Sequence, residues 1–191
     1  MSEKDEVLEI FTKSGALLKG HFLLSSGLHS DEYFEKFQVL QYPHYVETLC
    51  KKLADKFEDK KIGVVVGPTV GGIIIAYEVA KNLGVKAIFA EREEGGRVFK
   101  RGFSLNEGQR VLIVDDILTT GKSIFEVIDL VKQYNAYIVG IGVFLDRSGG
   151  TVEMDYDLKP LVTVSAKTFK PEECPLCKAG EPIYKPGSRK N

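Results

Sequence analysis

Apolar residues recur at helical spacing in two segments near the N-terminus. Residues 3–18 are predicted to form a helix whose apolar residues lie on roughly one side: Val7, Leu8, Ile10, Phe11, Leu17 and Leu18. A second helix is predicted from Pro43, because the apolar residues after it keep the spacing of one buried face: Val46, Leu49, Cys50, Leu53 and Phe57. Between them, residues 20–30 are expected to form short extended segments with turns, and residues 33–40 a strand.

From residue 62 onward, short apolar runs alternate with helical segments. The runs are rich in valine and isoleucine, which is typical of parallel strands buried on both faces. This order predicts an α/β fold with an open, mainly parallel sheet flanked by helices. The tail from Thr168 onward is expected to be irregular and exposed. Strands are predicted at 62–66, 87–90, 111–114, 138–145 and 161–165, and helices over 73–82 and 123–134.

Length and composition narrow the class of protein. A chain of 191 residues is expected to form a single domain, 1–191. No apolar run reaches the ~18 residues of a membrane span, and the acidic N-terminus is unlike a signal peptide. Three cysteines do not predict a disulfide framework, so a cytoplasmic location is expected. The net charge of −1 gives no electrostatic reason to expect a nucleic-acid or membrane partner.

The most informative stretch is VLIVDDILTTGKS at 111–123. Asp115 and Asp116 follow a buried strand and are expected where the chain leaves the sheet, just before small hydroxylic residues and a glycine that open a helix. Carboxylates accept hydrogen bonds from hydroxyls, and the N–H groups at a helix N-terminus bind anions. The stretch therefore predicts a ribose-phosphate site, with a solvated turn as the alternative. A Walker A loop is excluded, because Asp116 stands where its first glycine is required.

Two more loops are expected at the same edge of the sheet, because ligands bind outside the carboxyl ends of parallel strands. The glycine-rich residues 67–72 (GPTVGG) predict a second anion site or, alternatively, a tight turn. Asp146 and Arg147 follow the strand at 138–145. An arginine in this position either binds a carboxylate through two hydrogen bonds or forms a surface salt bridge.

A fourth loop at this edge, residues 91–103, combines glycines with cations. The glycines favour mobility and the cations match a polyanion, so a lid over a pyrophosphate group is predicted. A charged surface hairpin is the alternative. The cations are Arg92, Arg97, Lys100 and Arg101.

The stretch at 111–123 resembles the phosphoribosyl diphosphate (PRPP) signature of type I phosphoribosyltransferases. The segment GHFLLSSGLHSDEYF at 20–34 resembles the N-terminal hood of the orotate phosphoribosyltransferase family. The loops at 67–72, 91–103 and 146–147 follow in the order that this family has. We therefore expect the type I phosphoribosyltransferase fold with its small hood.

This resemblance covers residues ~15–150 and implies a hood formed mainly by residues 15–40 plus the C-terminal region. The chain departs from the family pattern at Ser25 and Gly71, where relatives often have lysines. More of the anion binding must then fall to the lid.

The resemblance also implies a reaction and its residues. The 5-phosphoribosyl group passes from PRPP to orotate, which gives orotidine 5′-monophosphate and pyrophosphate in de novo pyrimidine (UMP) synthesis. Asp115 and Asp116 would hold the ribose hydroxyls and act in catalysis with Lys100 and Arg101. The cofactor would be Mg²⁺, bound mainly through PRPP with the two aspartates nearby. The other implied PRPP contacts are Ile117, Leu118, Thr119, Thr120, Gly121, Lys122, Ser123, Arg92, Arg97 and Lys100.

For the second substrate, the resemblance implies orotate contacts from Thr119 and Arg147. It also implies a homodimer in which the lid loop 91–103 reaches the neighbouring site. Two other functions fit part of the pattern. A purine phosphoribosyltransferase would share the 115–123 loop but lack this hood, and a non-enzymatic regulator would bind PRPP without turnover.

One motif stays outside this assignment. Cys174 and Cys177 form a CxxC pair, which is half of a zinc site, but no second pair exists and the histidines at positions 21, 29 and 44 lie far upstream. We therefore expect no metal and no redox role for this pair. A metal site shared between two subunits is the alternative.

Overall fold

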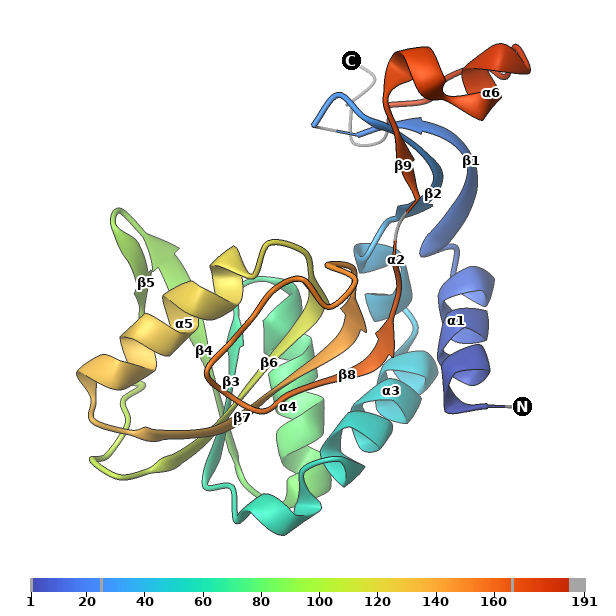
Figure 1. Cartoon of the computed structure of the whole chain (residues 1–191). Coiled ribbons are helices and arrows are strands. Elements are labelled where there is room, and N and C mark those ends of the chain that lie inside the picture. Colours follow the sequence, from blue (N-terminus) through green and yellow to red (C-terminus); the bar gives the residue numbers. More distant parts are fainter. Residues whose placement is uncertain (1, 25, 166, 186–191) are drawn as a thin grey trace.

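The chain forms two sheets in the computed structural model, which describes residues 2–24, 26–165 and 167–185 (Figure 1). The larger sheet has six strands in the order β5-β4-β3-β6-β7-β8, and the smaller has the order β1-β2-β9. The smaller sheet and the C-terminal segment that packs on it are called the hood below. The strands of the larger sheet are β3 (Val64–Pro68), β4 (Lys86–Glu93), β5 (Gly96–Val98), β6 (Arg110–Leu118), β7 (Tyr137–Asp146) and β8 (Leu158–Thr163).

Strands β3, β4, β6, β7 and β8 are parallel, and β5 alone runs antiparallel, to β4. Parallel neighbours need a crossover between them. Helix α4 (Gly71–Leu83) connects β3 to β4, and α5 (Lys122–Gln133) connects β6 to β7. The predicted α/β class with a mainly parallel sheet is confirmed.

Alternate residues of the central strands pack on opposite faces of this sheet. Val65 and Val114 belong to the core under α1, α3 and α4, whereas Val64, Val66 and Ile113 belong to the core under α5. The alternation follows from the period of two along a strand. No helix in the described part of the chain is long and apolar enough to cross a membrane. The helices before β3 are α1 (Glu3–Lys13), α2 (Phe37–Leu40), α3 (Pro43–Asp55) and a 3₁₀ turn at Glu58–Lys60.

The N-terminal predictions need two corrections. The helix predicted over 3–18 ends at Lys13, since Gly15 adopts a φ of +72° that a helix does not accommodate, and Leu17 begins strand β1 (Leu17–Leu23). The strand predicted over 33–40 is also wrong in its second half. Strand β2 (His29–Phe34) ends before α2, whose Val39 is buried in the core.

Most of the described C-terminal tail is exposed, as predicted, but the prediction that it is irregular is wrong. Strand β9 (Thr168–Phe169) pairs with the start of β2, and Tyr184 forms a bridge with Phe22 of β1. A 3₁₀ turn (Pro171–Glu173) and the short helix α6 (Pro175–Lys178) lie between them, and Cys174 is fully buried. Figure 1 shows this segment folded back onto β1 and β2. The positions Ser25 and 186–191 lie outside the described residues.

Candidate active site

Asp115 and Asp116 lie inside β6 and face opposite sides of the sheet. β6 stays paired with β7 through Leu118, so the chain leaves the sheet after Leu118 and not at the acids, as the sequence had suggested. Because side chains alternate along a strand, Asp115 shares the face of Ile113, toward α5, and Asp116 that of Val114, toward α4. Each carboxylate therefore has its own surroundings.

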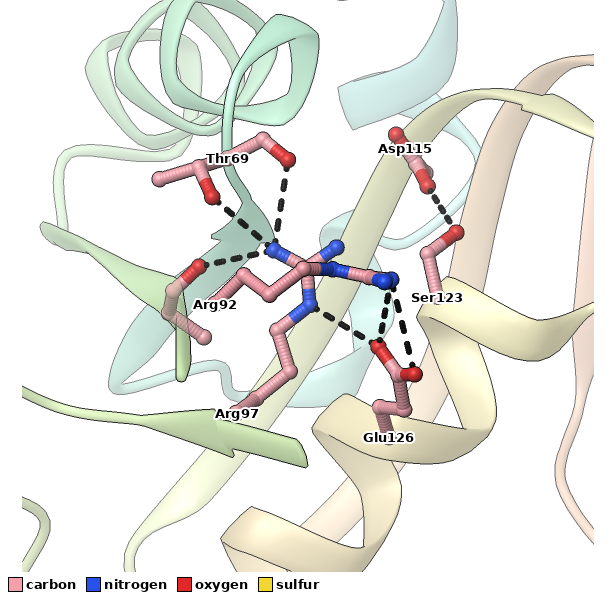
Figure 2. A network of polar contacts seen from close by, with 7 residues as sticks. Thr69, Arg92, Arg97, Asp115, Ser123 and Glu126 are labelled. Carbon is pink, nitrogen blue, oxygen red and sulfur yellow. Dashed lines mark hydrogen bonds and ion pairs between the residues drawn. The ribbon is translucent and has the colours of Figure 1, made fainter. Parts of the chain in front are cut away.

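Asp115 is held by the start of α5. Its side chain is buried, and it accepts hydrogen bonds from Ser123 Oγ at 2.9 Å and from the N–H of Asp116 at 2.9 Å (Figure 2). Burial, with the charge of Asp116 as a second cause, raises the pKa of Asp115 to about 6. At neutral pH the ionised Asp115 therefore lowers the stability of the fold. A ligand that donates hydrogen bonds to this carboxylate would offset that loss.

Asp116 faces the hood side of the sheet and is only 1% exposed. Lys36 Nζ donates to its Oδ1 at 3.0 Å, and the N–H of Ile117 donates to the same oxygen. Its Oδ2 is one of two buried side-chain atoms that lack a hydrogen-bond partner among the residues the structure describes. A Cβ at Gly71 would overlap Oδ2. This explains why the loop before α4 has glycine at a position where a lysine would displace the carboxylate.

Lys36 was not among the predicted site residues. It lies between β2 and α2, at a sequence separation of 80 residues from Asp116. The sequence around it shows only that it is a single cation near the aromatic hood residues Tyr33 and Phe34, which does not indicate a site residue. The contact with a carboxylate depends on tertiary structure, which no local pattern encodes.

A polar pocket lies where β6 meets α5. It is lined by Arg92 and residues 117–124, which include the predicted phosphate-binding positions. Gly121 has a φ of +75° at the N-cap of α5, a conformation that favours glycine. The first N–H groups of a helix lack intrahelical partners, and those of α5 begin at this pocket. The structure thus assembles residues 117–123 around one anion-sized space.

The loop between β3 and α4 approaches the same edge. Gly67 and Gly72 lie so close that a Cβ on Gly67 would overlap the backbone of Gly72, and one on Gly72 would overlap Pro68. The Thr69–Val70 peptide within this loop is cis. The glycines predicted at 67–72 therefore permit a close approach of backbone to backbone, and Gly71 permits one to Asp116.

The residues predicted as a lid form the β4–β5 hairpin and the turn after it, with Arg92 paired to Arg97. Arg97 is buried, and its guanidinium donates to Thr69 O and Oγ1, to Ala90 O and to Glu126 (Figure 2). It therefore ties the hairpin to the loop 67–72 and to α5. The exposed Arg92 reaches the same Glu126 at 3.2 Å.

The two remaining cations of this segment lie at its outer part. Lys100 forms an ion pair with Glu93 at 2.8 Å, and Arg101 forms one with Glu91 at 2.9 Å. Both cations are largely exposed, so these pairs are weak and exchange readily with a stronger anion. Their positions are compatible with a hairpin that binds a polyanion, and they lie away from Asp115 and Asp116 in this conformation.

Arg147 lies at the carboxyl end of β7 under the hood. Its guanidinium stacks on Phe34 of β2, 5.0 Å from the ring centroid, and its Nε is the second buried atom without a hydrogen-bond partner among the described residues. Burial lowers the pKa of Arg147 from its usual value, while the group stays a cation. The neighbouring Asp146 accepts instead from Ser148 N–H and Oγ. The alternative of a surface salt bridge therefore does not describe this pair.

The chain has relatives that are similar over nearly its whole length. Residues 38–174 match the phosphoribosyl transferase domain family. The orotate phosphoribosyltransferase of Thermoanaerobacter sp. (strain X514) is 53% identical over 188 residues, which cover 98% of this chain and 99% of that protein. That of Caldicellulosiruptor bescii is 50% identical over 187 residues, 98% of each chain.

Solved structures agree with this relationship. The orotate phosphoribosyltransferase from Aeropyrum pernix matches with a TM-score of 0.70 and 25% identity, over 83% of this chain and 93% of that one. An adenine phosphoribosyltransferase from Thermoanaerobacter pseudethanolicus matches with a TM-score of 0.59 and 22% identity, over 70% of this chain and 88% of that one. At this level of identity, the similarity to the adenine enzyme shows a shared fold and nothing about function.

Proposed function

The chain belongs to the orotate phosphoribosyltransferase family, and we propose that the carboxyl edge of its larger sheet is where PRPP and orotate react. The enzyme transfers the 5-phosphoribosyl group from PRPP to orotate, a pentosyl transfer that gives orotidine 5′-monophosphate and pyrophosphate in pyrimidine biosynthesis. One observation carries the residue-level proposal. Among the described residues, Asp116 Oδ2 on β6 and Arg147 Nε directly after the neighbouring β7 are buried without a hydrogen-bond partner, at the same edge of the sheet as the polar pocket.

We assign the PRPP half of the site to β6, α5 and the β4–β5 hairpin. Asp115 and Asp116 accept hydrogen bonds from the ribose hydroxyls, and residues 119–123 bind the 5′-phosphate at the N-terminus of α5. As pyrophosphate leaves, positive charge develops on the ribose ring and negative charge on the leaving group. Carboxylates beside the sugar and cations of the hairpin complement these charges, so catalysis is mainly electrostatic and positional.

Within the hairpin, the roles differ. The buried Arg97 donates from Nε to Glu126 and from Nη1 to Thr69 and Ala90, which supports a role in positioning the loop 67–72. Arg92 lines the anion pocket and is exposed, which supports direct contact with a phosphate. Lys100 and Arg101 would exchange their exposed acidic partners for the pyrophosphate.

The two aspartates also suit Mg²⁺, which prefers hard oxygen ligands and keeps several waters. Asp116 Oδ2 supplies a buried oxygen without a partner among the described residues, and Asp115 supplies a second carboxylate nearby. We propose that both lie beside an ion bound mainly through PRPP. When bound, the ion offsets negative charge on the diphosphate.

We propose that Arg147 and Thr119 bind orotate. A guanidinium under the hood, whose Nε has no hydrogen-bond partner in the described part of the chain, fits the substrate carboxylate through two parallel hydrogen bonds. Orotate carries a carboxylate and an acidic ring nitrogen, so attack at the sugar needs no strong base from the protein. The stacking of Arg147 on Phe34 fixes the direction of the guanidinium.

We further propose a homodimer in which the hairpin 91–103 reaches the neighbouring site. An apolar groove on α2, α3 and α4 supports this assembly, because α4 begins at the site loop 67–72 and a second copy seated there would lie beside that loop. Tyr77 and Ile74 are exposed on this groove. We expect Tyr77→Glu to shift the sedimenting species from dimer to monomer, and a monomeric wild-type chain would contradict the proposal.

The cytoplasmic location stays a prediction.

An assay of base consumption tests the function. With PRPP and Mg²⁺, we expect the protein to consume orotate and to leave adenine and hypoxanthine unchanged, and EDTA to stop turnover. Consumption of a purine would instead indicate a purine phosphoribosyltransferase. Binding of PRPP without turnover of any base would indicate a PRPP-sensing regulator.

A further inference from the structure

The hood brings two histidines near the N-terminus into contact with two cysteines near the C-terminus. They are His21 of β1, His29 of β2, and the pair Cys174 and Cys177 at α6. Their ligand atoms all lie within 4.8 Å of one another. Figure 1 shows the elements that carry them, β1, β2 and α6, together in the hood. We propose that these four residues bind one structural Zn²⁺ in each chain.

The distances match a tetrahedral site with two sulfur and two nitrogen ligands. With Zn–N near 2.0–2.1 Å and Zn–S near 2.3 Å, a tetrahedron separates nitrogen from sulfur by about 3.6 Å and two nitrogens by about 3.3 Å. In the structure, His21 Nε2 lies 3.6 Å from both sulfurs, and His29 Nδ1 lies 3.3 Å from Cys177 Sγ. The two nitrogens are 2.9 Å apart, so binding requires them to separate by a few tenths of an ångström.

The tautomer of His21 is fixed in the form that binds metal. Its Nδ1 lies 2.9 Å from the carbonyl oxygen of Glu181, and a carbonyl only accepts, so Nδ1 carries the proton. Nε2 therefore carries a lone pair, which faces the two sulfurs and His29 Nδ1. A hydrogen bond from the second ring nitrogen to a backbone carbonyl is the usual support of a histidine ligand.

Local geometry explains how each pair of ligands converges. The pairing of β1 with β2 is irregular between Lys19 and Phe22, which re-aims the intervening His21. Cys174 is the N-cap of α6, and Cys177 follows three residues later, so both thiols lie on one side of a single helical turn. Three of the four residues are buried, with Cys177 at the surface.

Charge and stability favour a metal over a bare cluster. Binding displaces the two thiol protons to solvent, and the two thiolates then neutralise the divalent ion. The hood also lacks an apolar core of its own, since its buried Phe22 belongs to neither core cluster of the described residues, and β9 adds only two paired positions. A small unit of this kind is commonly stabilised by a metal or a disulfide.

This assignment revises the reason for expecting no metal. Sequence separation had placed the histidines too far from the cysteines, whereas the pairing of β1 with β2 and the return of the C-terminal segment bring them into contact. The ligand set is complete within one chain. A site shared between two subunits is therefore unnecessary.

The test is the metal content of the full-length protein, purified from zinc-containing medium without added chelator. We expect about one zinc per chain by mass spectrometry of the metal. After removal by a chelator, Co²⁺ should restore the site and give the intense visible absorption of tetrahedral cobalt with thiolate ligands. Protein that contains almost no zinc and binds neither Zn²⁺ nor Co²⁺ would overturn the proposal.

Variants locate the ion. Cys177→Ser changes an exposed residue and should reduce the zinc content to near zero, whereas Cys177→His should retain it as a conservative ligand. Cys50→Ala in α3 and His44→Ala are matched controls that should keep zinc at the wild-type content, because neither side chain belongs to the cluster. Full zinc content in Cys177→Ser, or a metal-free chain with Cys174 and Cys177 oxidised to a disulfide, would contradict the site.

Discussion

The two halves of the proposed site are built in different ways. The PRPP half lies on β6 and the start of α5, where cores on both faces of the sheet hold the backbone and adjacent residues supply the carboxylates. The orotate half depends on the hood, where Phe34 and Arg147 meet only through tertiary structure, at 5.0 Å. On the proposed assignment, the larger sheet carries the groups common to phosphoribosyl transfer and also Arg147, and the hood contributes Phe34, which orients Arg147 toward the base.

The largest effect is expected at Asp116, in the PRPP half. Asp116→Asn removes a buried negative charge, whose Oδ1 lies 3.0 Å from Lys36 Nζ. On the proposed assignment, this carboxylate accepts a hydrogen bond from a ribose hydroxyl. We expect kcat/KM for PRPP to fall at least about 100-fold, as when a single charge-stabilising group is removed from an active site. Steady-state kinetics with PRPP varied measures this, and turnover near that of the wild type would contradict the ribose role.

The proposed orotate half is tested by Arg147→Ala. Loss of a two-pronged bond to a carboxylate should raise the KM for orotate about 10- to 100-fold, while the KM for PRPP changes little. Arg147→Lys should give an intermediate KM for orotate, since lysine keeps the positive charge but cannot form two parallel hydrogen bonds to one carboxylate. Arg110→Ala, at the opposite end of β6 where the guanidinium binds Lys60 O, is the matched control. Equal changes for both substrates would refute the separation of the two halves.

A smaller effect is expected from Gly71→Ala. The new Cβ would overlap Asp116 Oδ2, so the carboxylate must move. We expect weaker PRPP binding together with a loss of stability of about 1–3 kcal/mol, the usual cost of overpacking. Gly63→Ala is the control, because a Cβ there meets only ordinary contacts. Calorimetric titration with PRPP and urea unfolding report the two effects separately, and unchanged PRPP affinity would show that Oδ2 does not bind substrate.

The smallest effect concerns Asp115 and pH. Because its pKa is raised in the folded state, ionisation makes the fold less stable as pH rises from about 4 to about 6, and the penalty is complete above that range. Asp115→Asn should therefore be more stable than the wild type at pH 7.5, by up to about 3 kcal/mol, with a smaller difference at pH 5. Its affinity for PRPP should nevertheless fall.

Urea unfolding of wild type and variant at the two pH values measures this difference. Asp129→Asn, on the exposed side of α5, serves as the control and should leave the pH dependence unchanged. A stability difference that does not grow from pH 5 to pH 7.5 would show that Asp115 carries no penalty from its charge.

The same contrast explains what the sequence could predict. Strands β3, β6 and β7 follow from local runs of valine and isoleucine, and the acids of β6 follow from the PRPP signature. The sequence did not predict that the two acids face opposite sides of the sheet. That placement follows from the length of β6, which stays paired with β7 beyond the predicted end at residue 114.

The hood was harder to predict, since its structure depends on contacts between distant segments. Leu17 and Leu18 continue the helical spacing of α1, yet Gly15 ends the helix and both residues pair with β2. Lys36 has no local signal for its contact with Asp116. The residues after Thr168 read as a tail because their partners, His29 and Ser30, lie at the other end of the sequence.

The return of the C-terminal segment to the hood also orders the folding of the chain. β1 and β2 are synthesised long before Thr168 and Phe169, which complete their sheet, and before Tyr184, whose N–H donates to His21 O. The larger sheet is complete in sequence at Thr163, whereas β9 of the hood pairs with β2 across most of the chain, so the larger sheet is free to form before the hood is complete. A nascent chain thus contains the carboxylates of β6 and also Arg147 before it contains the C-terminal residues that complete the hood above them.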